Sequence, residues 1–273
     1  MSLVLFVTLG GKEATSMSVR FASILLSIII LSFPAKAEKL VLACNEWKPL
    51  VDATQKNQGL FVDILKTAGK RVGYDIEHQI LPWNRLVTLT KIGGIDGISC
   101  STFVAEHQSW ITYTQQAFWV TEVGLFVRKD SNIKLNQLID LKKHTFGALK
   151  GGSYTKVLQG LIDEDIKLIP YPREINGMKM LIEKRFDILF TGNVLGNYIL
   201  QTENLDQADT VVYLETLFLE DIHPAISTTR IDATLITERL SKGYKLIKAD
   251  GTLEALFKKH NLYPTSYNVK LTN

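Results

Sequence analysis

The first part of the chain switches between two hydrophobic periods, which predicts a strand–helix–strand–helix–strand order. In "GLFVDILKTAGKRVG" the apolar residues from Phe61 onward recur at the i, i+3, i+4, i+7 spacing of one helical face. "YDIEHQIL" instead alternates residue by residue, which is typical of a strand. With the apolar runs "KLVLAC" and "IDGISC" and the Gly-terminated "WNRLVTLTKIGG", the pattern predicts strands at 39–44, 74–81 and 95–100 and helices at 59–73 and 83–94. This order requires a parallel sheet with covering helices.

The same order recurs in the second part of the chain. Strands are predicted for "KKHTFGAL", "KLIPYP" and "FDILFTG", with helices in "GGSYTKVLQGLI" and "EINGMKMLIEKR" between them. Both parts contain an amphipathic helix, a polar break and an apolar-Asp-apolar strand, which supports two similar α/β lobes. We interpret "TEVGLFVRKDSNI" and "LEDIHPAIST" as extended crossings between the lobes, and "DGTLEALFKKHNL" as a closing helix.

The N-terminal segment has the pattern of a secretory signal peptide. An apolar run of 13 residues at 21–33 follows Arg20 and precedes the small-x-small sequence "AKA" at 35–37. The run is shorter than a membrane-spanning helix needs, and no second run long enough to span follows it. We therefore expect cleavage of residues 1–37 and a periplasmic protein. The segment "MSVRFAS" makes Met17 an alternative start to Met1.

Charge and motif content exclude several classes of function. Removal of residues 1–37 lowers the formal charge from +3 to +1. A near-neutral chain without a polybasic run gives no reason to expect nucleic acid or membrane adsorption. The histidines show no metal-ligand spacing, and no P-loop, Cys-x-x-Cys or Ser/His/Asp context occurs, so we expect no metal, cofactor or catalytic residue.

Two cysteines, Cys44 and Cys100, fall near the ends of predicted strands. In an oxidising compartment such a pair is a candidate disulfide. The alternative is two small buried apolar residues, because the sequence does not give the geometry that a bridge requires. The sequence leaves both interpretations open.

Several segments, taken in order, resemble the periplasmic solute-binding proteins of the polar-amino-acid type, the soluble receptors of ABC importers. They extend over residues 38–273 and include "GLFVDILKTAGKRVG", "PWNRLVTLTKIGGIDGI", "FVAEHQSWITYTQQAFW", "FVRKDS", "LIDLKKHTFGALKGGSYT", "KRFDILFTGN" and "KADGTLEALFKKH". The resemblance implies the two-lobe, type II periplasmic binding protein-like α/β fold. In that fold each lobe is a mostly parallel sheet flanked by helices, and two crossings form a hinge. Lobe 1 would comprise 38–126 plus 224–273, and lobe 2 would comprise 127–223.

The chain departs from the family where amino-acid-binding members grip the ligand. Aligned through "ITYTQQAF", the arginine that pairs with the ligand α-carboxylate is replaced by His107. A guanidinium binds a carboxylate bidentately at any pH, whereas an imidazole becomes charged only as the pH nears about 6.5. The aspartate that takes the ligand ammonium is replaced by Gly192, with Asn193 next. We therefore expect a solute other than an amino acid held in the standard way.

The resemblance also places aromatic and hydroxyl side chains in the cleft. Trp47 and Trp83 correspond to aromatic cleft walls, although either would also fit a hydrophobic core. Thr102 corresponds to a hydroxyl residue that contacts ligand, and the same residue would also suit a helix start.

Two further groups of candidate ligand-binding residues are polar. Gly152 and Ser153 of "GGSYT" would offer backbone N–H groups at a helix N-terminus, with Tyr154 directed into the cleft or over the helix. Arg85 could replace the missing cation or could be solvated. His107 could contact the ligand or be buried and hydrogen-bonded.

Three functions are compatible with these residues. The first is a non-catalytic, monomeric periplasmic receptor that captures a small polar solute and passes it to a membrane permease. The second is an enzyme like the cyclohexadienyl dehydratases of this fold, with Glu46 and His107 as acid and base. The third is a sensory solute-binding module without transport.

Overall fold

The computed structural model describes residues 37–134, 138–150, 160 and 167–263 of the 273-residue chain. Contacts divide the chain into two units at residues 37 and 38, and the helices and strands given below all belong to the second unit. The predicted signal peptide and, apart from Gly160, the predicted helix at 151–162 lie outside the described residues. Among the helices that are described, none combines the length and hydrophobicity needed to span a bilayer.

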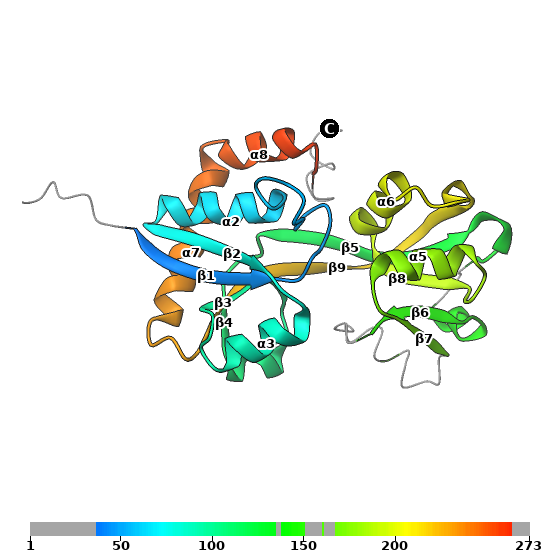
Figure 1. Ribbon diagram of the computed structural model, residues 1–273, viewed down its shortest axis with the longest axis horizontal. Helices are drawn as coiled ribbons and strands as arrows, with labels where there is room; N and C mark the ends of the chain where they lie inside the picture. The colour runs from blue at the N-terminus through cyan, green and yellow to red at the C-terminus, as the bar shows by residue number, and fades with distance from the viewer. Residues whose placement is uncertain (1–36, 135–137, 151–159, 161–166, 264–273) are drawn as a thin grey trace, which may run out of the picture. The chain divides into compact units, whose positions relative to one another are not determined.

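The nine strands of the described residues form one mixed sheet with the order β2-β1-β3-β9-β5-β8-β6-β7, and β4 pairs with β9 (Figure 1). The strands are β1 (Glu38–Cys44), β2 (Tyr74–Ile80), β3 (Gly97–Thr102), β4 (Ile111–Tyr113), β5 (Trp119–Arg128), β6 (Phe146–Leu149), β7 (Leu168–Tyr171), β8 (Ile188–Gly192) and β9 (Val211–Ser227). The α-helices are α2 (Leu60–Arg71), α3 (Trp83–Lys91), α5 (Glu174–Ile182), α6 (Asn193–Thr202), α7 (Ala233–Ala249) and α8 (Thr252–His260). Short 3-10 helices are η1 (Ala105–Ser109), η2 (Lys129–Ser131), η3 (Leu138–Lys143) and η4 (Ala208–Thr210).

The sheet contains two groups of parallel strands with the same internal order. In the first parallel group, β1 lies between β2 and β3 and is parallel to both. In the second parallel group, β6 lies between β7 and β8 and is parallel to both. The predicted α/β class and the parallel pairing in both parts of the chain are thus confirmed.

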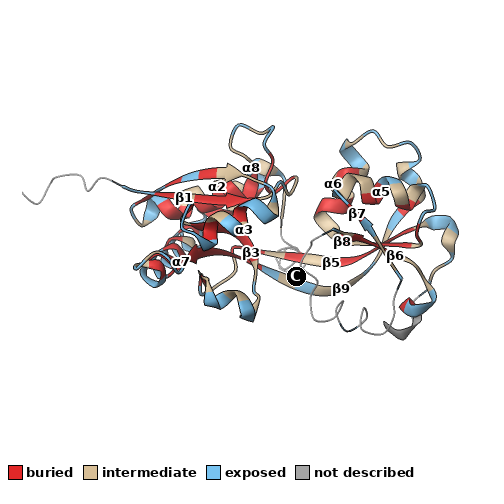
Figure 2. Ribbon diagram, turned by 60° about the horizontal axis from the view of Figure 1, so that its bottom comes forward, coloured by how far each residue is buried: buried red, intermediate tan, exposed pale blue. Residues whose placement is uncertain are grey.

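Alternation along β1 buries both faces of the first parallel group. Leu40, Leu42 and Cys44 join a core cluster with residues of α2, α7 and α8. Val41 and Ala43 instead join a cluster with residues of α3. Because successive side chains of a strand point to opposite faces, the helices cover both sides of this part of the sheet (Figure 2).

The end of β5 and its neighbour β8, in the second parallel group, show the same alternation. Phe126 and Leu189 pack in a cluster with residues of α5 and α6. Their chain neighbours Leu125, Val127 and Ile188 form a separate cluster on the other face, which includes Leu141 of η3.

A long antiparallel pair, β5 with β9, connects the two parallel groups. Its register runs from Trp119 opposite Ile222 to Arg128 opposite Val211, with two irregularities around Gly124. A Cβ at Gly124 would overlap the carbonyl oxygen of Glu215, so the close approach of the strands requires glycine there. β9 also pairs with β3, and β5 with β8, so both predicted crossings are extended strands of the sheet.

Three details differ from or extend the predicted pattern. The segment after Thr102, a residue that would also suit a helix start, contains only the short η1. Helices α6 and α7 were not predicted, and β9 begins at Val211 rather than near residue 219. The proposed lobe boundaries at 126/127 and 223/224 fall inside β5 and β9 and stay a prediction.

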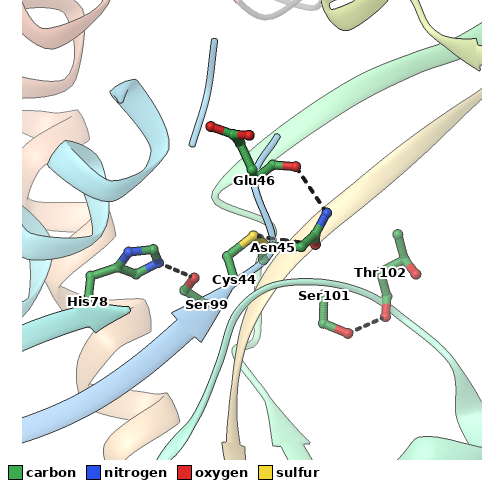
Figure 3. Close-up of a disulfide and its surroundings, with 8 residues drawn as sticks. Cys44, Asn45, Glu46, His78, Ser99, Ser101 and Thr102 are labelled. Atoms are coloured by element: carbon green, nitrogen blue, oxygen red, sulfur yellow. Dashed lines mark hydrogen bonds between the residues drawn. A yellow bond between two sulfur atoms is a disulfide. The ribbon is translucent and has the colours of Figure 1, made fainter. Parts of the chain in front are cut away.

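Cys44 and Cys100 form a disulfide between the neighbouring strands β1 and β3, with Cα atoms 5.7 Å apart. Asn45 and Thr102, next to these strand ends, lie beside the bridge (Figure 3). The bridge closes a chain segment of 56 residues that includes α2, β2 and α3. It therefore restricts the unfolded chain and holds together two strand ends that lead into the same region.

We expect the double substitution Cys44→Ala/Cys100→Ala to lower the free energy of unfolding by about 4 kcal/mol, the chain-entropy value for a loop of this length. Urea denaturation of both proteins measures this loss. Dithiothreitol should lower the midpoint of the wild type to that of the variant and leave the variant itself unchanged. A wild-type midpoint unaffected by full reduction would contradict the expectation.

Candidate functional site

A cavity of about 260 Å³ lies where the first parallel group, the second parallel group and the β5–β9 pair meet. Its lining comprises Asn45, Trp47, Trp83, Cys100, Thr102, Thr121, Val123, Leu149, Lys150, Glu174, Phe190, Thr191, Gly192, Leu195, Glu220 and Ile222. A second, larger cavity of about 750 Å³ shares Asn45, Trp47, Trp83, Leu149, Lys150, Glu174 and Leu195 with it. The shared lining makes the two cavities one continuous candidate site.

The β5–β9 pair supplies one surface of the smaller cavity, which we call the floor: Thr121, Val123, Glu220 and Ile222. Thr121 lies directly opposite Glu220, and Ile222 lies opposite Trp119. Since every second residue of a strand faces the same side, the register determines which side chains reach the cavity.

Aromatic rings make up much of the remaining surface. Trp47 follows β1, Trp83 begins α3 and Phe190 belongs to β8. Trp47 packs against the core clusters of both parallel groups, and its ring lies 6.3 Å from that of Phe61. Aromatic faces combined with a few polar groups suit the binding of a small solute.

Four uncharged polar side chains line the smaller cavity: Asn45, Thr102, Thr121 and Thr191. Thr121 and Thr191 are buried, with 5% and 6% of their surface exposed. Hydroxyl and amide groups in a largely apolar lining can donate to and accept from a bound molecule, so these groups suit a ligand that carries polar atoms.

Glu174 is a half-buried carboxyl at the first residue of α5. The hydroxyl of Tyr171 donates a hydrogen bond to its Oε2 at 2.8 Å. Burial raises the pKa of Glu174 to about 7, although hydrogen bonds from Tyr171 and Thr191 oppose part of that rise.

Glu220 is the second half-buried carboxyl of the smaller cavity and stands on the floor. Burial raises the pKa of Glu220 to about 7. The described lining also contains one ammonium group, that of Lys150, an exposed residue directly after β6. Both carboxyls therefore change charge near neutral pH, in a surface that is otherwise largely apolar and aromatic.

The structure brings three of the predicted ligand-binding residues together: Trp47, Trp83 and Thr102 all line the smaller cavity. Arg85 is exposed on α3 and lines neither cavity. Gly152, Ser153 and Tyr154 lie outside the described residues.

His107 also lines neither cavity. Its ring lies 4.9 Å from that of Trp110, and the ammonium of Lys91 lies 4.9 Å from the centre of the same tryptophan ring. Burial and the charge of Lys91 lower the pKa of His107. The imidazole is thus kept in its neutral form, which cannot replace the permanent charge of an arginine.

Gly192 lines the smaller cavity, whereas the neighbouring Asn193 lines neither one. The amide of Asn193 donates to Oε2 of Glu122 at 2.5 Å, and Asn197 donates to the side chain of Asn193. A Cβ at Gly192 would approach Thr121 Oγ1 at 3.4 Å, an ordinary contact. The missing aspartate is therefore not excluded by lack of space.

Among the lining residues that were not identified from the sequence are the polar and charged Asn45, Thr121, Lys150, Glu174, Thr191 and Glu220. Asn45 and Lys150 directly follow β1 and β6, so the rule that ligands bind at the carboxyl ends of parallel strands could have indicated them. Glu220 lay inside a predicted crossing, but only the strand register shows that it faces the cavity. Within the described residues no group of three or more His, Cys, Asp or Glu side chains could hold a metal ion.

Replacement of Glu220 by glutamine should stabilise the protein in a pH-dependent way. The pKa of Glu220 is raised from its ordinary value of 4.5 to about 7 by folding. Between these two pH values the folded protein keeps the proton of Glu220 while the unfolded chain has lost it, so the free energy of unfolding of the wild type falls as the pH rises. Glutamine stays neutral. We expect the unfolding free energy of Glu220→Gln minus that of the wild type to grow by about 1–2 kcal/mol between pH 4.5 and 7 and to stay level above that.

Urea denaturation at steps of half a pH unit measures this difference in unfolding free energy. The titration of all other groups cancels, because both proteins contain them. The exposed Glu215, on the same strand, provides the matched control Glu215→Gln, for which we expect a flat difference. Parallel curves for the two variants would show that the surroundings of Glu220 do not penalise its charge.

Comparison with known proteins connects this site to a family. The family model of the bacterial extracellular solute-binding proteins, family 3, matches residues 40–262. A comparison with curated protein sequences finds no match.

Three solved structures illustrate the similarity of the fold. A histidine kinase sensor domain with similarity to periplasmic binding proteins aligns with a TM-score of 0.70 and 18% identity, over 85% of this chain and 100% of that chain. An ancestral amino acid-binding protein, described as a precursor of cyclohexadienyl dehydratase, gives 0.65 and 19%, over 86% and 98%. A putative L-cystine ABC transporter protein from Listeria monocytogenes gives 0.66 and 17%, over 81% and 95%.

At these identities the structural likeness shows the fold alone. The family match, however, covers nearly every element from β1 to α8. The resemblance inferred from the sequence is confirmed, and the chain belongs to the bacterial extracellular solute-binding proteins, family 3.

Proposed function

We propose that the protein is a non-catalytic, monomeric receptor that captures a small polar solute in the candidate site and presents it to the membrane permease of an ABC importer. In this proposal residues 1–37 are a signal peptide, and the receptor acts in the periplasm. Family membership supports the class of function, and the aromatic and polar lining supports a small polar ligand.

The observation that carries the proposal is the origin of the cavity lining. Trp83 and Thr102 come from the first parallel group and its helices, Thr191 from the second, and Thr121 from the β5–β9 pair. A solute in the cavity contacts all three. In a hinge mechanism such a ligand favours the arrangement in which both sides bind it, and that arrangement is what a permease would recognise.

The positions of the two candidate catalytic residues favour a receptor over a dehydratase. Glu46 lines the larger cavity, whereas His107 lines neither cavity and packs against Trp110. General acid–base catalysis needs both groups within hydrogen-bond reach of one substrate. We expect no ring product, followed by its ultraviolet absorbance, when the protein is incubated with prephenate or arogenate.

A solute panel followed by thermal melting tests the receptor proposal. The purified protein is melted with amino acids, carboxylates, sugar acids and amines. A solute at 100 times its dissociation constant adds about 2.7 kcal/mol to the free energy of unfolding. We expect one chemical class to raise the melting temperature and the common α-amino acids to have little effect. A panel without any stabilising solute would contradict the proposal.

Tryptophan fluorescence then locates the bound solute. Trp47 and Trp83 line the cavity, whereas Trp110 contacts His107 outside it. We expect the solute to change the emission of the wild type and of Trp110→Phe, and the change to decrease strongly in Trp47→Phe and Trp83→Phe. An undiminished response in both cavity variants would place the binding site elsewhere. Co-purification with a permease rather than with a sensor protein would separate transport from sensing.

A further inference from the structure

The charges around the smaller cavity are unequal in number and in exposure. Among the described residues its ionisable lining is Glu174, Glu220 and Lys150. The two carboxyls are half-buried, whereas Lys150 is exposed. When both carboxyls are ionised, the cavity therefore has a negative interior.

Neither carboxyl has a cationic partner in the described part of the chain. The hydrogen bonds to Glu174 come from the uncharged hydroxyls of Tyr171 and Thr191. Among the described residues no ion pair within 4.0 Å involves Glu174 or Glu220. An unpaired, partly buried carboxylate costs folding free energy. A ligand that brings a positive charge would supply the missing partner.

The rings around the cavity suit the same kind of ligand. The faces of Trp47, Trp83 and Phe190 can attract an organic cation through their quadrupoles and can cover its apolar part. The volume of about 260 Å³ restricts the solute to a small molecule, although a chain could extend into the larger cavity of about 750 Å³.

The same surroundings disfavour a free α-carboxylate. No arginine lines the smaller cavity among the described residues, and Arg173, which lines the larger one, donates its Nε–H to Asn176. A ligand carboxylate would lie among Glu174 and Glu220, and like charges in a poorly solvated site repel strongly.

We infer that the solute is a compact organic amine without an α-carboxylate, whose ammonium binds Glu174 and Glu220 and whose apolar part lies against Trp47, Trp83 and Phe190. This inference rests on the proposed receptor function and specifies the class of its solute.

Protonation of Glu174 and Glu220 makes the affinity for an amine depend on pH. Because their pKa values are raised to about 7, each is only partly ionised at neutral pH, and a bound ammonium favours the ionised form. Amine affinity should therefore fall as the pH drops from 8 to 6. The other ionisable groups that line the two cavities are Glu46, Lys48, Lys150, Arg173, Tyr198 and Glu203.

Matched pairs of an amine and its parent amino acid test the inference. Agmatine with arginine, putrescine with ornithine, histamine with histidine and tyramine with tyrosine differ only by the α-carboxylate. Thermal melting and titration calorimetry at pH 8 measure binding to the purified protein. We expect at least one amine to bind at least tenfold more tightly than its parent, and about tenfold more weakly at pH 6 than at pH 8.

Charge-removing variants then test the residues. We expect Glu174→Gln and Glu220→Gln each to weaken binding of that amine at least tenfold at pH 8, and the surface control Glu215→Gln to leave it unchanged. Cooperative melting of each variant shows that it is folded. Tight binding of the amine to both cavity variants, equal binding of its parent, or binding that ignores pH would each overturn the inference.

These experiments distinguish a wrong solute class from a wrong receptor function. If a neutral or anionic solute binds and none of the four amines does, the solute class is wrong and the receptor function stands. If neither the amines nor the wider panel stabilises the protein, both are wrong.

Discussion

The pairing of β5 with β9 is the constraint on which the rest of the structure depends. These strands are far apart in sequence, yet their backbone hydrogen bonds join the first parallel group, through β3, to the second, through β8. The same register places Thr121 opposite Glu220 and turns both toward the cavity. A shift by one residue would turn the floor side chains to the other face of the pair and bring their neighbours in their place. Fold and site chemistry are therefore set by one hydrogen-bonded ladder, and Gly124 maintains its close approach.

The candidate site combines features that oppose folding with features that favour binding. Burial of Glu174 and Glu220 raises their pKa values to about 7, so the folded protein is penalised for carrying both charges above neutral pH. Cores on both faces of the sheet and the Cys44–Cys100 bridge offset such a local cost. The bridge also ties the ends of β1 and β3 together, directly beside Asn45 and Thr102 of the cavity lining. The stability that the cores and the bridge supply thus permits unfavourable charges in the candidate site.

The sequence predicted the regular part of this arrangement and little of the cavity chemistry. A parallel sheet is buried on both faces, so its strands and covering helices have regular patterns of apolar residues. In residues 39–100 and 167–192 such patterns identified the elements β1, β2, β3, β7, β8, α2, α3 and α5. Helix α7 was not identified, and β9 proved longer than the crossing predicted from its apolar end. Trp47, Trp83 and Thr102, chosen through family position, line the cavity, and their contact with a ligand stays a prediction. His107 was not brought to the cavity, since a position in an alignment does not fix the direction of a side chain in a short 3-10 helix.

The site takes side chains from strands, as at Glu220, and from the start of a helix, as at Gly192. Both kinds of position can change without a change of fold, which explains how one fold can hold different ligands. A floor residue such as Glu220 can change its charge without altering the backbone ladder, because its side chain points away from the hydrogen bonds. At Gly192, at the start of α6, an added Cβ would make only ordinary contacts, yet this chain has no side chain there. With no side chain at residue 192, the carboxyls that line the smaller cavity are those of Glu220 on the β5–β9 pair and Glu174 on α5. Solved structures of this fold include a kinase sensor domain and an ancestral amino acid-binding protein, so the same sheet occurs in proteins described by different roles.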